Sequence, residues 1–222
     1  IQSALESKME EVQAERLKTA LAAHADALFR DPDAPVAGNP KGAVTVVEFF
    51  DYNCGYCKRG FPDVAKLIKS DPNVRVVFRE LPILSKGSEE AARIAIAASM
   101  QGKYWDFHTR MIEFKGQADE ASAMKIAEKA GLDDARIKKD MKSEKVDSEI
   151  KKDRELAQNL GINGTPHIIV GNRSTVVRRQ TKVFELHRSQ RRPFTNAAAV
   201  FDLTQTEPPA GQLEALEIKH FP

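Results

Sequence analysis

The stretch that decides the fold runs from residue 44 to residue 57 and reads Val44-Thr45-Val46-Val47-Glu48-Phe49-Phe50-Asp51-Tyr52-Asn53-Cys54-Gly55-Tyr56-Cys57. Its first half is an apolar, β-branched run of the kind that forms a buried strand. Asn53 is a favourable helix N-cap, so we expect a helix that Cys54 opens. Residues three apart share a face of a helix, which would bring the sulfurs of Cys54 and Cys57 together.

These two residues are the only cysteines of the chain. A strand that leads into a CxxC helix is typical of a thiol–disulfide redox site. The free N–H groups and dipole of the helix would favour the thiolate of Cys54, which predicts Cys54 as the attacking sulfur and Cys57 as the resolving one. A zinc site would need four ligands, and the five histidines show no ligand-like spacing. A structural disulfide closing so small a loop would constrain the unfolded chain little. We therefore expect neither a metal nor an organic cofactor.

A second motif follows about a hundred residues later and reads Gly161-Ile162-Asn163-Gly164-Thr165-Pro166-His167-Ile168-Ile169-Val170. The glycines and the X-Pro bond indicate an irregular turn, in which a cis proline is tolerated, followed by a short strand. An ordinary trans proline before an edge strand is the alternative.

Together, the run from Val47 to Lys58 and the Gly164-Thr165-Pro166 motif resemble the DsbA family of thioredoxin-fold proteins. The most similar branch contains Com1-like proteins and the suppressor-of-copper-sensitivity protein C (ScsC). The resemblance covers about residues 35–172 and implies an α/β thioredoxin fold with an inserted helical domain, in a periplasmic protein. It further implies that Pro166 is cis and faces the CxxC across a substrate groove. Thr165 would then bind the backbone of an extended substrate peptide, and Gly55 and Tyr56 complete the predicted substrate-binding set.

Glu48 is the third predicted catalytic residue. An acid inside an apolar strand is costly unless it has a partner or a task. Burial would raise its pKa and make it a proton acceptor for Cys57 near neutral pH, and it stands where the DsbA-like motif has its buried acid. The alternative is a strand-end glutamate that points to solvent.

The first segment differs from the rest, because residues 3–29 contain no Gly or Pro and favour a helix. Its apolar stripe consists of Leu5, Met9, Val12, Leu17, Leu21, His24 and Leu28, with a break in phase around Arg16. Asp31-Pro32-Asp33-Ala34-Pro35 must end this helix. We predict an N-terminal helix at 1–34 that forms a homodimer or homotrimer, as N-terminal extensions do in the ScsC-like branch. The alternative is a helix that folds back on its own domain.

The predicted thioredoxin domain spans 35–172, with a helical insertion at about 87–160. The final segment, 173–222, departs from the family: residues 173–192 carry seven Lys or Arg against one acid, Glu185. Only Ser174 to Val177 reads as a possible hairpin strand. A basic stretch can bind nucleic acid, but the net charge of the chain is only +2, so we predict no nucleic-acid partner.

The expected function is thiol–disulfide exchange on protein substrates. The Gly55-Tyr56 dipeptide matches the active site of the disulfide isomerase DsbC, and an oligomer suits isomerisation, so a disulfide isomerase or reductase is the first prediction. A DsbA-type thiol oxidase is the alternative, and a copper-binding or chaperone-like thiol module is a third, because two thiolates suit Cu(I). A membrane redox protein would be the electron partner.

Overall fold

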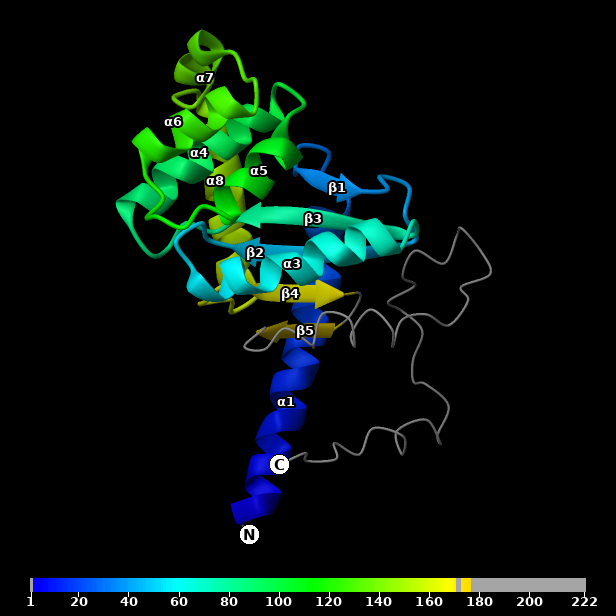
Figure 1. The fold of residues 1–222 in the computed structure, drawn as a ribbon. Helices are drawn as coiled ribbons and strands as arrows, with labels where there is room; N and C mark the ends of the chain where they lie inside the picture. Colours follow the sequence, from blue (N-terminus) through cyan, green and yellow to red (C-terminus); the bar gives the residue numbers. More distant parts are fainter. Residues whose placement is uncertain (1, 171–172, 177–222) are drawn as a thin grey trace. The chain divides into compact units, whose positions relative to one another are not determined.

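The computed structural model describes residues 2–170 and 173–176 and is built around one mixed five-stranded sheet (Figure 1). In sheet order, the strands are β1 (Val36–Gly38), β3 (Val74–Glu80), β2 (Val44–Phe50), β4 (His167–Val170) and β5 (Arg173–Val176). The central strand β2 is parallel to β3 and antiparallel to β4, and this register places Glu48 between Phe78 and Ile168. Glu48 therefore lies in the middle of the sheet.

Helices account for most of the remaining described chain. They are α1 (Gln2–Ala23), α2 (Ala25–Phe29), α3 (Gly55–Ser70), α4 (Lys86–Ser99), α5 (Tyr104–Ile112), α6 (Glu120–Lys129), α7 (Asp134–Asp140) and α8 (Glu144–Asn159). Helices α4 to α8 lie between β3 and β4 in the chain, where the sequence predicts the insertion. Figure 1 shows α4 to α7 gathered to one side of the sheet, with α3 lying in front of the sheet and running along its strands. The side chains of Ser85, Asp119, Asp133 and Ser143 accept backbone N–H groups at the starts of four of these helices, which explains why the helices begin where they do.

One face of the sheet packs against α3 and the insertion in a single apolar core. Val46, Phe50 and Phe78 of the strands are at most 1% exposed and join Phe61 of α3 and Phe107 of α5 in this core. Alternate residues of β2 and β3 point to the other face, as the period of a strand requires.

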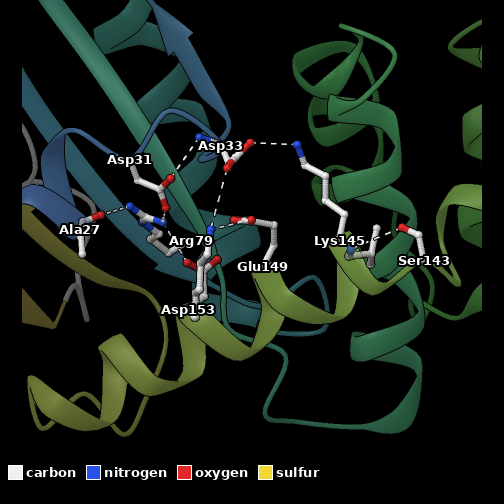
Figure 2. A network of polar contacts seen from close by, with 10 residues as sticks. Ala27, Asp31, Asp33, Arg79, Ser143, Lys145, Glu149 and Asp153 are labelled. Carbon is white, nitrogen blue, oxygen red and sulfur yellow. Dashed lines mark hydrogen bonds and ion pairs between the residues drawn. The ribbon is translucent and has the colours of Figure 1, made fainter.

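The opposite face carries a buried arginine, Arg79 of β3, which is 1% exposed. Its guanidinium donates to Asp31 at 2.9 Å and to Asp153 of α8 at 3.0 Å, and it also donates to the carbonyl of Ala27. The other oxygen of Asp153 accepts the backbone N–H of Glu80 at 2.8 Å. Figure 2 shows these groups converging from three separate parts of the chain. The network fixes α2 and the segment after it to β3 and α8.

The N-terminal helix is not continuous, because α1 ends at Ala23 and α2 begins at Ala25. The apolar stripe divides within α1, between the exposed Val12 and the buried Leu21. Leu21 and Leu28 are 1% and 0% exposed, whereas Met9 and Val12 are 60% and 43% exposed. The second part of the stripe thus belongs to the core, and the exposed first part is the part available to a partner.

Two elements differ from the sequence prediction or extend it. The three-residue strand β1 was not predicted, because Pro35 and Gly38 leave too short a run for a period to show. Strand β5 pairs antiparallel with β4, which agrees with the hairpin expected at Ser174, and the rest of the predicted basic segment lies outside the described residues. Within the described part of the chain, none of the helices has the length and apolar character that a membrane span requires.

Candidate active site

Both cysteines lie at the start of α3 and are free thiols. The helix begins at Gly55, and its N-cap is Cys54, whose sulfur accepts the backbone N–H of Cys57 at 3.4 Å. The prediction that Asn53 caps this helix is therefore wrong by one residue. The sulfur itself takes the place of the usual capping oxygen, so it lies directly on the free N–H groups of the helix.

The two thiols differ sharply in acidity. The pKa of Cys54 is lowered to about 6, chiefly by a hydrogen bond from the Cys57 side chain and further by the Thr165 side chain and backbone N–H groups, which together outweigh its burial. The pKa of Cys57 is raised well above its ordinary value, first by burial and then by its hydrogen bond to Cys54. At neutral pH Cys54 is mostly a thiolate, which is the nucleophilic form, and Cys57 keeps its proton.

The second motif lies against Cys54. The Thr165–Pro166 peptide bond is cis, as the resemblance implies. Cys54 Sγ lies 3.2 Å from the carbonyl oxygen of Thr165 and donates to it when protonated. The two sequence motifs, more than a hundred residues apart, thus meet at one sulfur.

Glu48 is 6% exposed, which excludes the alternative that it points to solvent. Its pKa is raised to about 8, first by burial and second by the negative charge of Cys54. The charge of Glu48 in turn raises the pKa of Cys57. A carboxyl group with this pKa can take up or release a proton near neutral pH.

The loop before Cys54 is fastened on several sides. Asp51 is 1% exposed, and its carboxylate accepts three backbone N–H groups: that of Asn53 at 2.7 Å, that of Ile83 at 2.9 Å and that of Leu84 at 3.0 Å. Asp51 was not predicted from the sequence. An acid directly after a strand is too common to signal such a role, and Ile83 and Leu84 are 32 and 33 residues away in the chain.

Several exposed side chains belong to the CxxC or to residues that Asp51 ties to the loop before it. Tyr56 is 53% exposed, and Arg59 lies over its ring with the guanidinium carbon 4.3 Å from the ring centre. Ile83 and Leu84, which Asp51 ties to the loop before Cys54, are 45% and 54% exposed. Gly55 is also exposed. The predicted substrate-binding residues Gly55 and Tyr56 are thus accessible beside a nearly buried nucleophile.

The described residues contain no group of three or more His, Cys, Asp or Glu side chains placed to hold a metal ion. What the site does contain is a thiolate, a neighbouring thiol and a buried acid. These groups suffice for thiol–disulfide exchange, in which one S–S bond forms as another breaks and protons move between the sulfur atoms and a nearby base.

Comparison with known proteins agrees with this geometry. Residues 45–188 match the family model described as a DSBA-like thioredoxin domain. A thioredoxin-like oxidoreductase from Silicibacter pomeroyi DSS-3 is 46% identical, with a TM-score of 0.71 over 74% of this chain and 95% of that one. A linker-deletion mutant of ScsC from Proteus mirabilis is 25% identical, with a TM-score of 0.77 over 85% and 88%. A periplasmic thioredoxin-like protein from Salmonella enterica serovar Typhimurium is 27% identical, with a TM-score of 0.67 over 74% and 94%.

Some curated relatives are much longer. The Na(+)/H(+) antiporter NhaA 3 of Salinispora tropica is 32% identical over 146 residues, which are 64% of this chain and 22% of the antiporter. The chain thus spans about a fifth of the length of such relatives.

Proposed function

We propose that this chain, which belongs to the DSBA-like thioredoxin domain family, is a thiol–disulfide oxidoreductase that acts in the periplasm as a disulfide isomerase or reductase of protein substrates. The observation that carries the proposal is the pairing of a stabilised Cys54 thiolate with a protonated Cys57 at the start of α3. Support for the compartment comes from the likeness to a periplasmic protein.

In the proposed reaction, the Cys54 thiolate attacks one sulfur of a substrate disulfide. The substrate S–S bond breaks, a Cys54–substrate disulfide forms, and the other substrate sulfur leaves as a thiolate. For reduction, Cys57 gives its proton to Glu48 and attacks Cys54 Sγ, which releases the second substrate thiolate. Two electrons then pass from the Cys54–Cys57 dithiol to the substrate, and the protein is left with a disulfide. For isomerisation, a substrate thiolate attacks the mixed disulfide instead and regenerates Cys54.

Protein substrates are supported by the surroundings of Cys54. Tyr56 lies within the CxxC, and the backbone of Ile83 and Leu84 bonds to Asp51 in the loop before it; all three side chains are exposed and largely apolar, and apolar segments are what a misfolded polypeptide presents. The carbonyl of Thr165 points to Cys54, where a substrate backbone would pass and could add as an extended strand.

We further propose that α1 joins copies of this chain into a dimer or trimer. Met9 and Val12 are exposed apolar side chains on a long helix, a pattern that suits helix pairing. The likeness to ScsC supports a related architecture. Several active sites around one substrate would favour isomerisation over simple oxidation.

The test compares reactivation of scrambled ribonuclease by the full chain and by a truncation lacking residues 1–19. This cut leaves Leu21, Leu28 and Asp31 in place, so the core and the Arg79 network are retained. The proposal predicts disulfide shuffling by the full chain, a smaller mass in solution for the truncation, and weaker shuffling. Equal shuffling by a truncation that has become monomeric would contradict the role of α1.

A DsbA-type oxidase is the second candidate, and one observation favours it. A thiol pKa of about 6 stabilises the reduced pair, which makes the disulfide form a better oxidant. Oxidation of reduced ribonuclease without reactivation of the scrambled form, by both proteins, would establish the oxidase and contradict the isomerase.

A further inference from the structure

The residues that flank the CxxC on either side both hold the same loop of the helical insertion. This loop, residues 114–118, connects α5 to the N-cap of α6. Asn53, before Cys54, bonds to the backbone of Ala118. Lys58, after Cys57, bonds to the backbone of Phe114 and Gly116.

Asn53 bonds Ala118 in both directions. Its Oδ1 accepts the Ala118 N–H at 2.6 Å, and its Nδ2 donates to the Ala118 carbonyl at 3.0 Å. Nδ2 also lies 3.1 Å and 3.0 Å from the hydroxyls of Ser85 and Ser88 at the start of α4. A peptide group offers one donor and one acceptor, so only a side chain that carries both can pair with it in this way. The amide of Asn53 meets that requirement.

Lys58 completes the contact from the other side. Its ammonium donates to the carbonyl of Phe114 at 2.6 Å and to that of Gly116 at 3.0 Å. The ammonium group is thus directed to the loop. Burial accordingly lowers its pKa.

The loop is also pressed against α4. A Cβ atom at Gly87 would lie 2.2 Å from the Ala118 carbonyl oxygen, so this approach requires glycine at position 87. Ala118 itself is fully buried. The loop is therefore held at Ala118 by α4 on one side and by Asn53 on the other.

We propose that residues 114–118 form a clamp that positions Cys54, and that Asn53 and Lys58 are the positioning residues through which it acts. Cys54 directly follows Asn53, and its own N–H is held by Asp51 at 3.0 Å. The backbone at Cys54 is thus held by Asp51, and the residue before it is held by the clamp. The proposal rests on thiol–disulfide exchange at Cys54 and is independent of its direction.

The test is the pH dependence of Cys54 alkylation in the reduced full chain, comparing Asn53→Ala with Asn39→Ala. Asn39 is a matched control, because its Nδ2 donates to Pro72 O at 2.7 Å and its Oδ1 accepts Lys41 N–H at 2.9 Å, in the loop that leads into the start of β2, at the end away from Cys54. Both variants lose a two-sided amide contact at a half-buried site. We expect the Asn53 variant alone to shift the alkylation midpoint upward, by about half a pH unit or more, because a displaced Cys54 sulfur would lose the hydrogen bond from the Cys57 N–H and one such bond is worth about that much.

A second pair of variants covers the case in which Asn53→Ala does not fold. Lys58→Gln is compared with Lys103→Gln, because Lys103 also donates to loop carbonyls, those of Ala130 and Gly131. At about 1 M salt, where exposed charges are screened beyond roughly 3 Å, the clamp predicts that the upward shift for Lys58→Gln persists.

Three results would overturn the clamp. The first is an unchanged midpoint in Asn53→Ala, or in Lys58→Gln at high salt. The second is an equal shift in the matched controls. The third is an unsubstituted protein whose Cys54 alkylation midpoint lies near the ordinary value of about 8.5. This third result would also contradict the assignment of Cys54 as a thiolate at neutral pH, whereas the first two would not.

Discussion

Replacing Glu48 by Gln should remove a large pH-dependent loss of stability. The pKa of Glu48 is raised from 4.5 to about 8 in the folded protein, so its protonated form favours folding. The stability that this proton contributes is fully present below the unfolded pKa and is lost as pH rises through the folded pKa. Gln mimics the protonated acid at every pH and should not show this loss.

The size of the effect follows from the pKa difference. A shift of about 3.5 units corresponds to about 5 kcal/mol in total, of which about 3.5 kcal/mol falls between about pH 5 and about pH 8. The free energy of unfolding of Glu48→Gln, minus that of the unsubstituted protein, should therefore increase by about 3.5 kcal/mol across this interval. Because burial is the main cause of the shift, most of this increase should remain in the oxidised protein, where Cys54 carries no charge.

The assay is urea unfolding of both proteins at several pH values, with reductant present and then without it. If the difference in unfolding free energy between the two proteins stays constant from about pH 5 to about pH 8, the pKa of Glu48 is not raised in the folded protein. Glu48 would then ionise without penalty in the folded protein, and the acid would not be a proton acceptor matched to neutral pH.

Three further predictions concern single contacts. Replacing Thr165 by Val should raise the pKa of Cys54, because the Thr165 side chain helps to lower it; an unchanged alkylation midpoint would contradict that contribution. Replacing Arg79 by Met should cost about 3–5 kcal/mol of unfolding free energy, because Asp153 and Asp31 lose their buried partner. The exposed pair Lys138–Asp134 is the control, where Lys138→Met should change the unfolding free energy by less than about 1 kcal/mol. Equal losses of unfolding free energy in the two variants would contradict a stabilising role of the Arg79 network. The loss of unfolding free energy in Arg79→Met should also become smaller at low pH, because Asp153, whose pKa is raised to about 7, is protonated there and leaves no buried negative charge. Denaturant titrations at two pH values measure the loss and its pH dependence.

The sequence predicted the features that local pattern controls. The apolar run of β2, the CxxC helix and the helical insertion follow from composition and period, and the structure has all of them. Glu48 was recognised because an acid in an apolar strand is unusual. The N-cap was misplaced by one residue because the sulfur of Cys54 takes the place of a capping oxygen and accepts the Cys57 N–H.

Contacts between distant parts of the chain could not be predicted from the sequence. Asn53 meets Ala118, which is 65 positions away, and Arg79 meets Asp153, which is 74 positions away. Nothing in the local pattern of either residue names its partner. The same holds for the second part of the N-terminal stripe, since Leu21 and Leu28 look no different in sequence from a stripe that binds another subunit.

The most direct test of the active site is the pH dependence of alkylation at each cysteine of the reduced chain, read by mass spectrometry. Cys54 should be modified with a midpoint at about pH 6, while Cys57 should stay protected well into the alkaline range. Modification of Cys57 before Cys54, or a common midpoint for both thiols, would contradict the assignment of Cys54 as the nucleophile.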